Sequence, residues 1–556
     1  MTGSRTFKTA MTKHGAIIAI IALCLLLSVP VLTVFSSIGA SSGGVWAHLA
    51  DTLLWDYIGQ SLLLMAGVGL MVLVLGVAPA WLVTMNRFPG SRLLEWALVL
   101  PLAMPAYIIA YTYTGMLDVT GPVQGFIRDT FDLRFGDYWF PQIRSLGGAI
   151  TMLSLVLYPY VYLLSRMAFL EQSVCVLEVS RTLGAGPWRA FTRVAVPLAR
   201  PAIIAGLALV LMETLADYGT VQYFGISTFT TGIFRTWFGM GSSTAAAQLS
   251  AVLMIFILVL VLTEHWSRSR ARYHHTSSKY SRLPQIRLTG FRQWLALVFC
   301  AAPVVLGFLI PFLQLAYWAW DTRDLVDFSA FRELLFNSLR LALTAAVIAL
   351  VLGLFISYAK RLQPNLTMRS SVRILSLGYA IPGTVIAVGV LIPFAWVDNA
   401  IDAWMQQQFG ISTGLIFSGT LVAVVFAYIV RFLPVAMNTV DAGLSKIRPS
   451  MDDAGRSMGM GSWQILRHIH IPMLRGSLLT ASLLVFVDVL KELPATLILR
   501  PFNFNTLAIR TYELANQERL TEAAASALMI VLAGIIPVII ISLSISASRP
   551  GHDVRT

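Results

Sequence analysis

Five charged residues lie inside long apolar stretches of the sequence, where an unpaired charge is costly. They are Glu213, Asp217, Asp488, Lys491 and Glu492. The first two acids are four residues apart, as are the last two, so each pair of carboxylates lies on one face of a helix. Carboxylates from two facing helices would attract a cation along a translocation path or at its gate. The alternative is a neutralised structural network in which Lys491 and Arg500 are the partners of the acids.

Proline interrupts two of the apolar stretches. Pro101 and Pro105 lie in one stretch and Pro382 in another, and such breaks are tolerated where protein or a water-filled cavity satisfies the freed backbone. Three tyrosines follow the first break, namely Tyr107, Tyr111 and Tyr113. A phenolate oxygen is a ferric ligand, but tyrosine is also common in the interfacial belt of membrane proteins, and we favour this second interpretation.

Cysteine and histidine form no metal-ligand pattern in the sequence. The three cysteines, Cys24, Cys175 and Cys300, are far apart, so neither a disulfide framework nor a zinc site is indicated. His274 and His275 are neighbours in a polar segment, where solvation is the simpler interpretation. The ligands of any bound metal therefore stay unassigned.

The composition identifies the class of protein. Of the 556 residues, 57% are hydrophobic and 12% are charged, and the mean hydropathy is +0.75. A soluble domain has about 25% charged residues, so this chain has too little polar surface and is expected to be an integral membrane protein. A helix needs about 20 apolar residues to cross the hydrocarbon core. Twelve such stretches are predicted, at roughly 15–37, 60–85, 93–116, 146–170, 199–222, 244–264, 292–317, 335–359, 373–397, 411–435, 475–499 and 521–546.

Basic residues indicate the orientation of these spans. Most of the 40 Lys and Arg residues fall in segments on the side of the N-terminus, including 166–200, 268–292 and 431–475. Because basic loops stay in the cytoplasm, we expect a multi-pass membrane protein with both termini cytoplasmic. The net charge of +13 is then a signal of topology and requires no nucleic-acid partner.

The sequence contains two copies of one unit. Residues 178–200 align without gaps on residues 453–475, at an offset of 275. The matched pairs include Arg181/Arg456, Gly184/Gly459, Gly186/Gly461, Trp188/Trp463, Pro197/Pro472, Glu213/Asp488 and Asp217/Glu492, and Gly76/Gly353 at an offset of 277. Duplication predicts an all-α protein of two parallel six-span halves, 1–264 and 292–556, joined by a cytoplasmic linker at 265–291.

The segment between the fourth and fifth spans of each half carries the most specific motif. It reads EVSRTLGAGPWRAFTRVAVP at 178–197 and DAGRSMGMGSWQILRHIHIP at 453–472. In both copies an acid is followed by Arg and Gly at fixed spacing, then by Trp and Pro. The glycine suits a turn between two short helices, and the proline suits the start of the next span. The tryptophan is a large apolar anchor on a basic segment and suits a partner's groove, although a Trp at the headgroup level is the plain alternative.

These segments resemble the coupling motif of binding-protein-dependent ABC transporter permeases, which is written Glu-Ala-Ala, three residues, Gly, nine residues, Ile-x-Leu-Pro. The spacing is kept in both copies, with Asp453 in place of Glu and Val179-Ser180 in place of Ala-Ala. The resemblance implies that ten residues couple to an ATPase. They are Glu178, Arg181, Gly184, Trp188 and Pro197 in the first copy and Asp453, Arg456, Gly459, Trp463 and Pro472 in the second.

A second stretch narrows the resemblance to one branch of this family. Residues 488–508, DVLKELPATLILRPFNFNTLA, are similar to the ferric-iron uptake permeases, with fused thiamine permeases as near relatives. The resemblance covers the whole chain and implies a fused, two-copy permease of the bacterial inner membrane that moves ferric iron by alternating access. Thiamine or another small solute stays open as the substrate.

The sequence itself contains no nucleotide-binding loop. A P-loop requires Gly-Lys, and none of the six lysines follows a glycine. We therefore expect no enzymatic activity and no permanently bound cofactor, with ATP hydrolysed by another subunit. The resemblance implies two copies of a cytoplasmic ATPase and a periplasmic substrate-binding protein. An ion-coupled secondary carrier is the alternative class, but it has no reason to keep two coupling segments.

Overall fold

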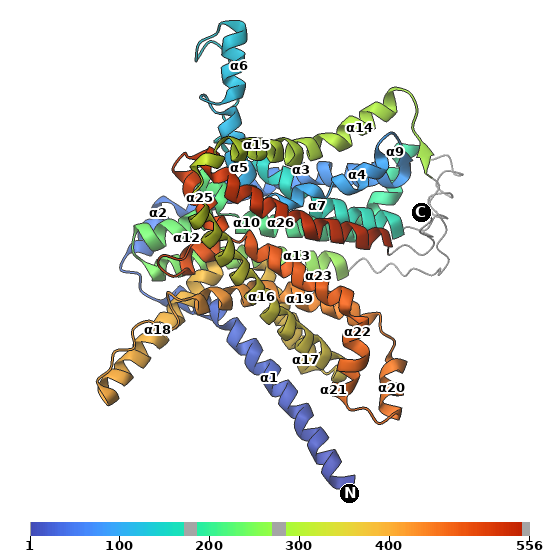
Figure 1. Cartoon of the computed structure of the whole chain (residues 1–556), viewed down its shortest axis with the longest axis vertical. Helices are drawn as coiled ribbons and strands as arrows, with labels where there is room; N and C mark the ends of the chain where they lie inside the picture. The colour runs from blue at the N-terminus through green and yellow to red at the C-terminus, as the bar shows by residue number, and fades with distance from the viewer. Residues whose placement is uncertain (1, 172–185, 270–284, 548–556) are drawn as a thin grey trace. The chain divides into compact units, whose positions relative to one another are not determined.

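The computed structural model describes residues 2–171, 186–269 and 285–547 (Figure 1). Its regular structure is helical apart from one parallel pairing of two short strands, β1 (Asn86–Arg87) and β2 (Ile286–Arg287). Helices satisfy their own backbone polar groups, which a chain of this composition requires in hydrocarbon. The predicted all-α membrane fold is confirmed.

Ten helices in the described ranges are long and apolar enough to cross a membrane, and two bent helix pairs raise the number to as many as twelve. The bent pairs are Ser91–Ala103 with Ala106–Phe131, bent by 92°, and Ser462–Met473 with Arg475–Leu490, bent by 77°. Pro105 lies at the first break, and Pro382 precedes α18 (Gly383–Phe409) as its N-cap residue. Both proline breaks expected from the sequence are therefore present.

Two predicted spans start about three turns too early. The bounds of the span predicted at 373–397 are wrong because α18 runs from Gly383 to Phe409. The prediction of a span at 411–435 is wrong because residues 411–420 form a loop and α19 runs from Leu421 to Ser445. Asp398 of α18 holds this loop, since its carboxylate accepts hydrogen bonds from three successive backbone N–H groups, 416–418, at 2.7–3.1 Å. Hydropathy alone cannot distinguish an apolar loop that is held by a carboxylate elsewhere in the chain from an apolar helix.

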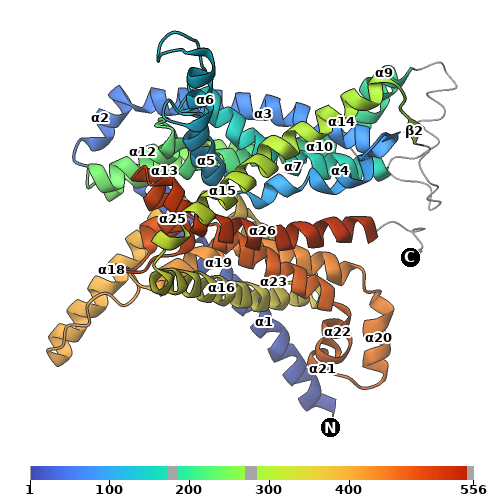
Figure 2. The ribbon, with the colours of Figure 1, turned by 45° about the horizontal axis from the view of Figure 1, so that its top comes forward.

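The described chain packs into two compact units that do not follow the halves of the sequence. Unit 1 contains Met1–Trp46, Ile233–Ala251 and Phe328–Ile509. Its helices are α1 (Thr2–Ser36), α16 (Phe328–Leu362), α17 (Leu366–Ser376), α18, α19, α20 (Pro449–Ser457), α21 (Ser462–Ile465), α22 (Ile471–Met473), α23 (Arg475–Leu490) and α24 (Pro494–Leu499). In both views α16, α19 and α23 lie side by side, and α1 packs on α17 and α18 (Figures 1 and 2). The first span of the chain thus joins the second half.

Unit 2 contains Ala47–Gly232, Val252–Asp327 and Arg510–Thr556. Its helices are α3 (Leu54–Met85), α4 (Ser91–Ala97), α5 (Ala106–Leu117), α6 (Pro122–Phe131), α7 (Leu146–Glu171), α9 (Pro187–Ala190), α10 (Val196–Ala216), α11 (Gly219–Tyr223), α14 (Phe291–Val304), α15 (Ile310–Asp321) and α26 (Leu520–Ala547). Helices α2 (Val45–Thr52), α12 (Phe229–Phe234), α13 (Ser243–Ser269) and α25 (Leu507–Asn516) cross the unit boundaries. The centre is α3, α7 and α10, and α15 packs on α26.

Matched glycines of the two halves have the same role in packing. A Cβ at Gly76 of α3 would lie 2.7 Å from Cβ of Val161 in α7. A Cβ at Gly353 of α16 would lie 3.0 Å from the backbone nitrogen of Met437 in α19. Each glycine lets two central helices approach closely, as small residues do in membrane proteins. The duplication seen in the sequence therefore extends to the helix packing inside each unit.

Candidate functional site

The second coupling segment, residues 453–472, is part of a helical hairpin that precedes the amino end of α23. Helix α20 ends at Ser457, Gly459 has a φ of +79°, and α21 begins at Ser462. A Cβ on Gly459 would meet nothing within 4 Å, so the glycine is needed for its backbone conformation and not for space. The predicted glycine turn is confirmed in this copy. In the first copy Glu178, Arg181 and Gly184 lie outside the described residues.

The predicted aromatic anchors are exposed in both copies. Trp463 is 67% exposed and Trp188 is 73% exposed. Large apolar side chains that protrude from a basic segment are typical of a docking surface. Pro197 lies where the sequence places it, in the first turn of α10. Pro472 does not start the next span, because it lies in α22 and the span α23 begins at Arg475.

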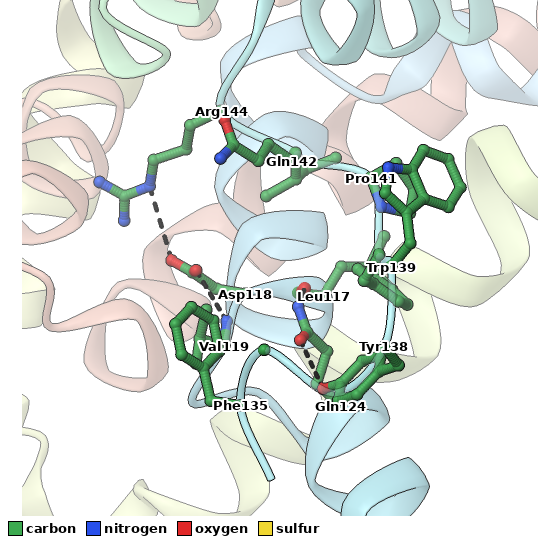
Figure 3. Close-up of a pocket in the computed structure, with 13 residues that line it drawn as sticks. Leu117, Asp118, Val119, Gln124, Phe135, Tyr138, Trp139, Pro141, Gln142 and Arg144 are labelled. Atoms are coloured by element: carbon green, nitrogen blue, oxygen red, sulfur yellow. Dashed lines mark hydrogen bonds and ion pairs between the residues drawn. The ribbon is translucent and has the colours of Figure 1, made fainter. Parts of the chain in front are cut away.

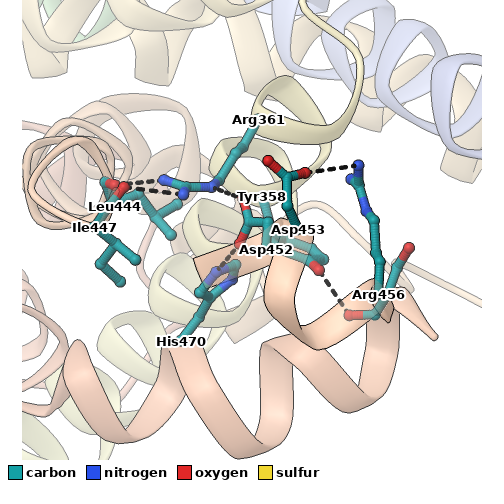
Figure 4. Close-up of polar contacts among 9 residues, drawn as sticks. Tyr358, Arg361, Leu444, Ile447, Asp452, Asp453, Arg456 and His470 are labelled. Carbon is teal, nitrogen blue, oxygen red and sulfur yellow. Dashed lines mark hydrogen bonds and ion pairs between the residues drawn. The ribbon is translucent and has the colours of Figure 1, made fainter. Parts of the chain in front are cut away.

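A buried polar network fixes the second segment to the rest of unit 1 (Figure 4). The carboxylate of Asp452 lies 2.8 Å from Nε of Arg361 and 2.5 Å from Nε2 of His470. Arg361 also donates to two backbone carbonyls at the end of α19, at 2.6 and 2.9 Å. The hydroxyl of Tyr358 donates to the carbonyl of Ser462 at 2.6 Å. These contacts join α16 and α19 to both arms of the hairpin.

The two neighbouring acids of α20 have different surroundings. Asp453, the acid of the motif, pairs with Arg456 at 3.8 Å, and both side chains are more than half exposed. This pair therefore lies on the surface, where it can meet a partner. The structural acid is Asp452, which the sequence analysis missed because the motif assigns the acidic position to its neighbour. The signal was present in the second acid and in His470, a polar residue among apolar neighbours.

Replacing Asp452 with Asn should loosen the hairpin. The change removes a charge-assisted hydrogen bond from a side chain that is only 14% exposed, which costs about 2 kcal/mol. We expect faster amide hydrogen exchange across residues 449–473, with the membrane spans unaffected. Asp453→Asn is the matched control and should leave the exchange rates unchanged. Equal protection in the two variants would contradict the structural role of Asp452.

Glu492 lies at the break between α23 and α24 and caps the second of these helices. Its carboxylate accepts hydrogen bonds from the backbone N–H groups of Ala495 and Thr496, both at 3.0 Å. Nη1 of Arg431 in α19 lies 3.4 Å from the same carboxylate. A Cβ at Gly383 would lie 2.6 Å from both charged groups, so α18 also closes on this pair. The result is a buried ion pair at the junction of three membrane helices.

Asp217 occupies the matched position in the first half. It follows the last residue of α10, and its carboxylate accepts from the backbone N–H of Val221 at 3.1 Å and from the hydroxyl of Thr220 at 3.0 Å. The fifth span of the first half and its counterpart in the second are therefore both broken at an acid that caps the following short helix. Alignment of the two repeats predicted that Asp217 and Glu492 occupy equivalent positions, but it did not predict that both acids cap a helix.

The other three charged residues of the group lie within about one turn of Glu492 or Asp217 in sequence. Lys491 pairs with Asp488 at 2.9 Å, and Glu213 is partly buried in α10. Arg500 binds the side chain of Asn505. Lys491 is thus a partner of one acid, as the network interpretation held, but the partner of Glu492 is Arg431. Assignment of the five residues to the translocation path stays a prediction.

Arg431 is a residue that the sequence analysis misplaced. It was assigned to a cytoplasmic segment, and this is wrong because Arg431 lies within α19 and is 9% exposed. The apolar residues on both sides of it could have signalled an arginine inside a span. Removing this one arginine from the count leaves the basic excess on the side of the N-terminus.

The tyrosines after the first proline break are core residues of unit 2. Tyr107, Tyr111 and Tyr113 are 7%, 1% and 6% exposed. The hydroxyl of Tyr113 donates to the carbonyl of Leu306 at 2.6 Å. Placement in an interfacial belt is therefore wrong for these residues, because α5 is covered on the faces that carry them.

An open cavity of about 380 Å³ lies in unit 2 between the end of α5, α6 and the segment that leads to α7 (Figure 3). The guanidinium of Arg144 lies 3.7 Å from a carboxylate oxygen of Asp118 and 2.8 Å from one of Glu518. Phe135 and Trp139 line the same cavity and are 73% and 86% exposed. Within the described ranges, no group of three or more His, Cys, Asp or Glu side chains could hold a metal ion.

Comparison with known families decides the class. Residues 72–269 and 349–551 each match the model of the binding-protein-dependent transport system inner membrane component. The chain belongs to this family. The family model matches this permease twice, once in each half of the sequence, in agreement with the internal repeat. Like its permease relatives, it is a transport subunit and not an enzyme.

The most similar relatives include ferric-iron permeases. The permease is 27% identical to the Fe(3+)-transport system permease protein FbpB 2 of Haemophilus influenzae, over 87% of this chain and 89% of the relative. It is 24% identical to the putative ferric transport system permease protein FbpB 1 of the same organism, over 80% and 70%. It is also 27% identical to the molybdenum transport system permease protein ModB of Escherichia coli, over 39% of this chain and 96% of the relative. The expected resemblance to fused ferric permeases is confirmed.

Proposed function

We propose that this permease moves ferric iron from a periplasmic binding protein to the cytoplasm, driven by ATP and operating by alternating access. The observation that carries the proposal is the similarity to a ferric permease over 87% of the chain. The similarity to a molybdenum permease covers 39% and supports only the general transport role. Thiamine or another small solute is the alternative substrate. A secondary carrier is the alternative class, and the two coupling segments argue against it.

The proposed partners are two ATPase subunits, one under each coupling segment, which hydrolyse ATP on behalf of the permease. The exposed Trp188 and Trp463 support one docking point in each half. We place both termini in the cytoplasm, with the halves 1–264 and 292–556 joined by the linker 265–291. In this orientation the cavity at Arg144 faces the periplasm, so its exposed aromatic residues are candidates for contact with the binding protein.

The substrate can be tested in vesicles that contain the permease with its ATPase and binding protein. We expect ATP-dependent uptake of ferric iron and no uptake of molybdate or thiamine above background. The control is an ATPase whose P-loop lysine is replaced, which should abolish uptake. Uptake of molybdate or thiamine in place of iron would change the substrate, and uptake that follows an ion gradient without ATP would change the class.

A further inference from the structure

A long apolar groove runs along unit 1 between α1, α16 and α19, with a volume of about 480 Å³. One face of α16 forms its floor, from Asn337 through Arg340 and Ile348 to Leu352. These sixteen residues of helix extend about 22 Å, which exceeds the roughly 15 Å depth of hydrocarbon in one leaflet. Helices α1, α16 and α19 each qualify as a membrane span, so the groove lies at the depth of lipid chains.

The two ends of the groove differ in chemistry. Arg340 and Asn337 lie toward the amino end of α16, about two to three turns from its start at Phe328. Thr344 is the one other polar residue of the lining, and its hydroxyl already donates to the carbonyl of Arg340 at 2.8 Å. The rest of the lining is aliphatic or aromatic. A groove with a cation at the headgroup end and apolar walls below it matches the two parts of a phospholipid.

We propose that this groove binds one acyl chain of an anionic phospholipid, whose phosphate pairs with Arg340. A guanidinium binds phosphate through two parallel hydrogen bonds. Arg340 lies near the start of the span predicted at 335–359, where its long side chain can extend to the membrane surface. The groove is open along its length, since Leu26 of α1 and Val422 of α19 are 53% and 50% exposed. In a membrane the molecule that reaches such an opening is lipid.

A lipid bound in this groove would join three helices of unit 1. Its chain would contact α1, α16 and α19 together, and α1 is the span that comes from the other half of the sequence. Filling the groove restores the dispersion contacts that an empty groove lacks. We therefore expect the lipid to stabilise the attachment of α1, independently of which substrate is transported.

The test uses the full-length permease in a neutral detergent, with phosphatidylglycerol or phosphatidylcholine added at equal concentration. Ligand that binds only the folded state raises the melting temperature. We expect a larger rise with phosphatidylglycerol, and one retained molecule of it by native mass spectrometry. Arg340→Gln should abolish the difference between the two lipids, whereas Arg340→Lys should keep most of it. Arg332→Gln is the matched control on the same helix, outside the lining.

A second variant tests the apolar part of the groove. Ile348→Trp should fill the groove and reduce the response to both lipids, whereas Val351→Trp, on the exposed side of α16, should respond like the wild type. Equal responses of the wild-type protein to the two lipids would overturn the proposal. So would a normal preference for phosphatidylglycerol in Arg340→Gln, or a normal lipid response in Ile348→Trp.

Discussion

Gly459→Val should give a permease that is expressed and inserted but transports at least tenfold more slowly. A β-branched residue at a φ of +79° is strained by roughly 1–3 kcal/mol, and the turn can relieve this strain only by moving α20 against α21. About 1.4 kcal/mol corresponds to a factor of ten, so strain of this size is enough to displace the docked conformation. The measurement is ATP-dependent uptake together with ATP hydrolysis by the assembled transporter. Weak ATPase association or uncoupled hydrolysis is the expected cause.

The neighbouring positions supply the controls. Gly459→Asn should retain most activity, because asparagine tolerates the left-handed region. Gly461→Ala should behave like the wild type, since Gly461 has a φ of −73° and a Cβ there would be 3.9 Å from the nearest atom outside its chain neighbours. We expect Gly184→Val to act in the same way by sequence equivalence. Full coupled transport in the Gly184→Val/Gly459→Val double variant would refute the assignment of these glycines to the coupling turn.

The sequence predicts the membrane fold and the coupling segments well because both depend on local pattern. Apolar stretches of about 20 residues predict the spans, and the spacing from Asp453 through Gly459 to Pro472 predicts the hairpin. The positive φ of Gly459 follows from residue type and place in the motif. The misplaced span at 411–435 marks the limit, because its correction depends on Asp398, which is far from the loop in sequence.

The contacts of the candidate sites could not be predicted because they join distant parts of the chain. Arg431 and Glu492 are 61 residues apart, and Arg361 and Asp452 are 91 apart. A basic residue near the end of an apolar run reads equally well as a loop residue or as a buried partner. The packing of α1 on α18 is likewise absent from the sequence signal, since an apolar span does not specify its neighbour.

Glu492→Gln should destabilise the protein far more than loss of a surface pair would. The side chains of Arg431 and Glu492 are only 10% and 2% exposed, and removing one partner of a buried pair costs about 3–5 kcal/mol because the other charge is left unpaired. The measurement is thermal unfolding in detergent alongside uptake. Asp488→Asn, which breaks the more exposed pair with Lys491, is the matched control and should cost about 1 kcal/mol or less.

Second-site substitutions distinguish a structural role of Glu492 from a role on the translocation path. If Glu492 is structural, adding Arg431→Met to Glu492→Gln should recover most of the stability, because no unpaired charge remains, whereas adding Lys491→Met should not. The first half has Val156 where alignment at the offset of 275 places Arg431, so Asp217→Asn leaves no arginine unpaired and should be milder. Variants of Glu492 that are as stable as the wild type but defective in uptake would instead place this carboxylate on the translocation path.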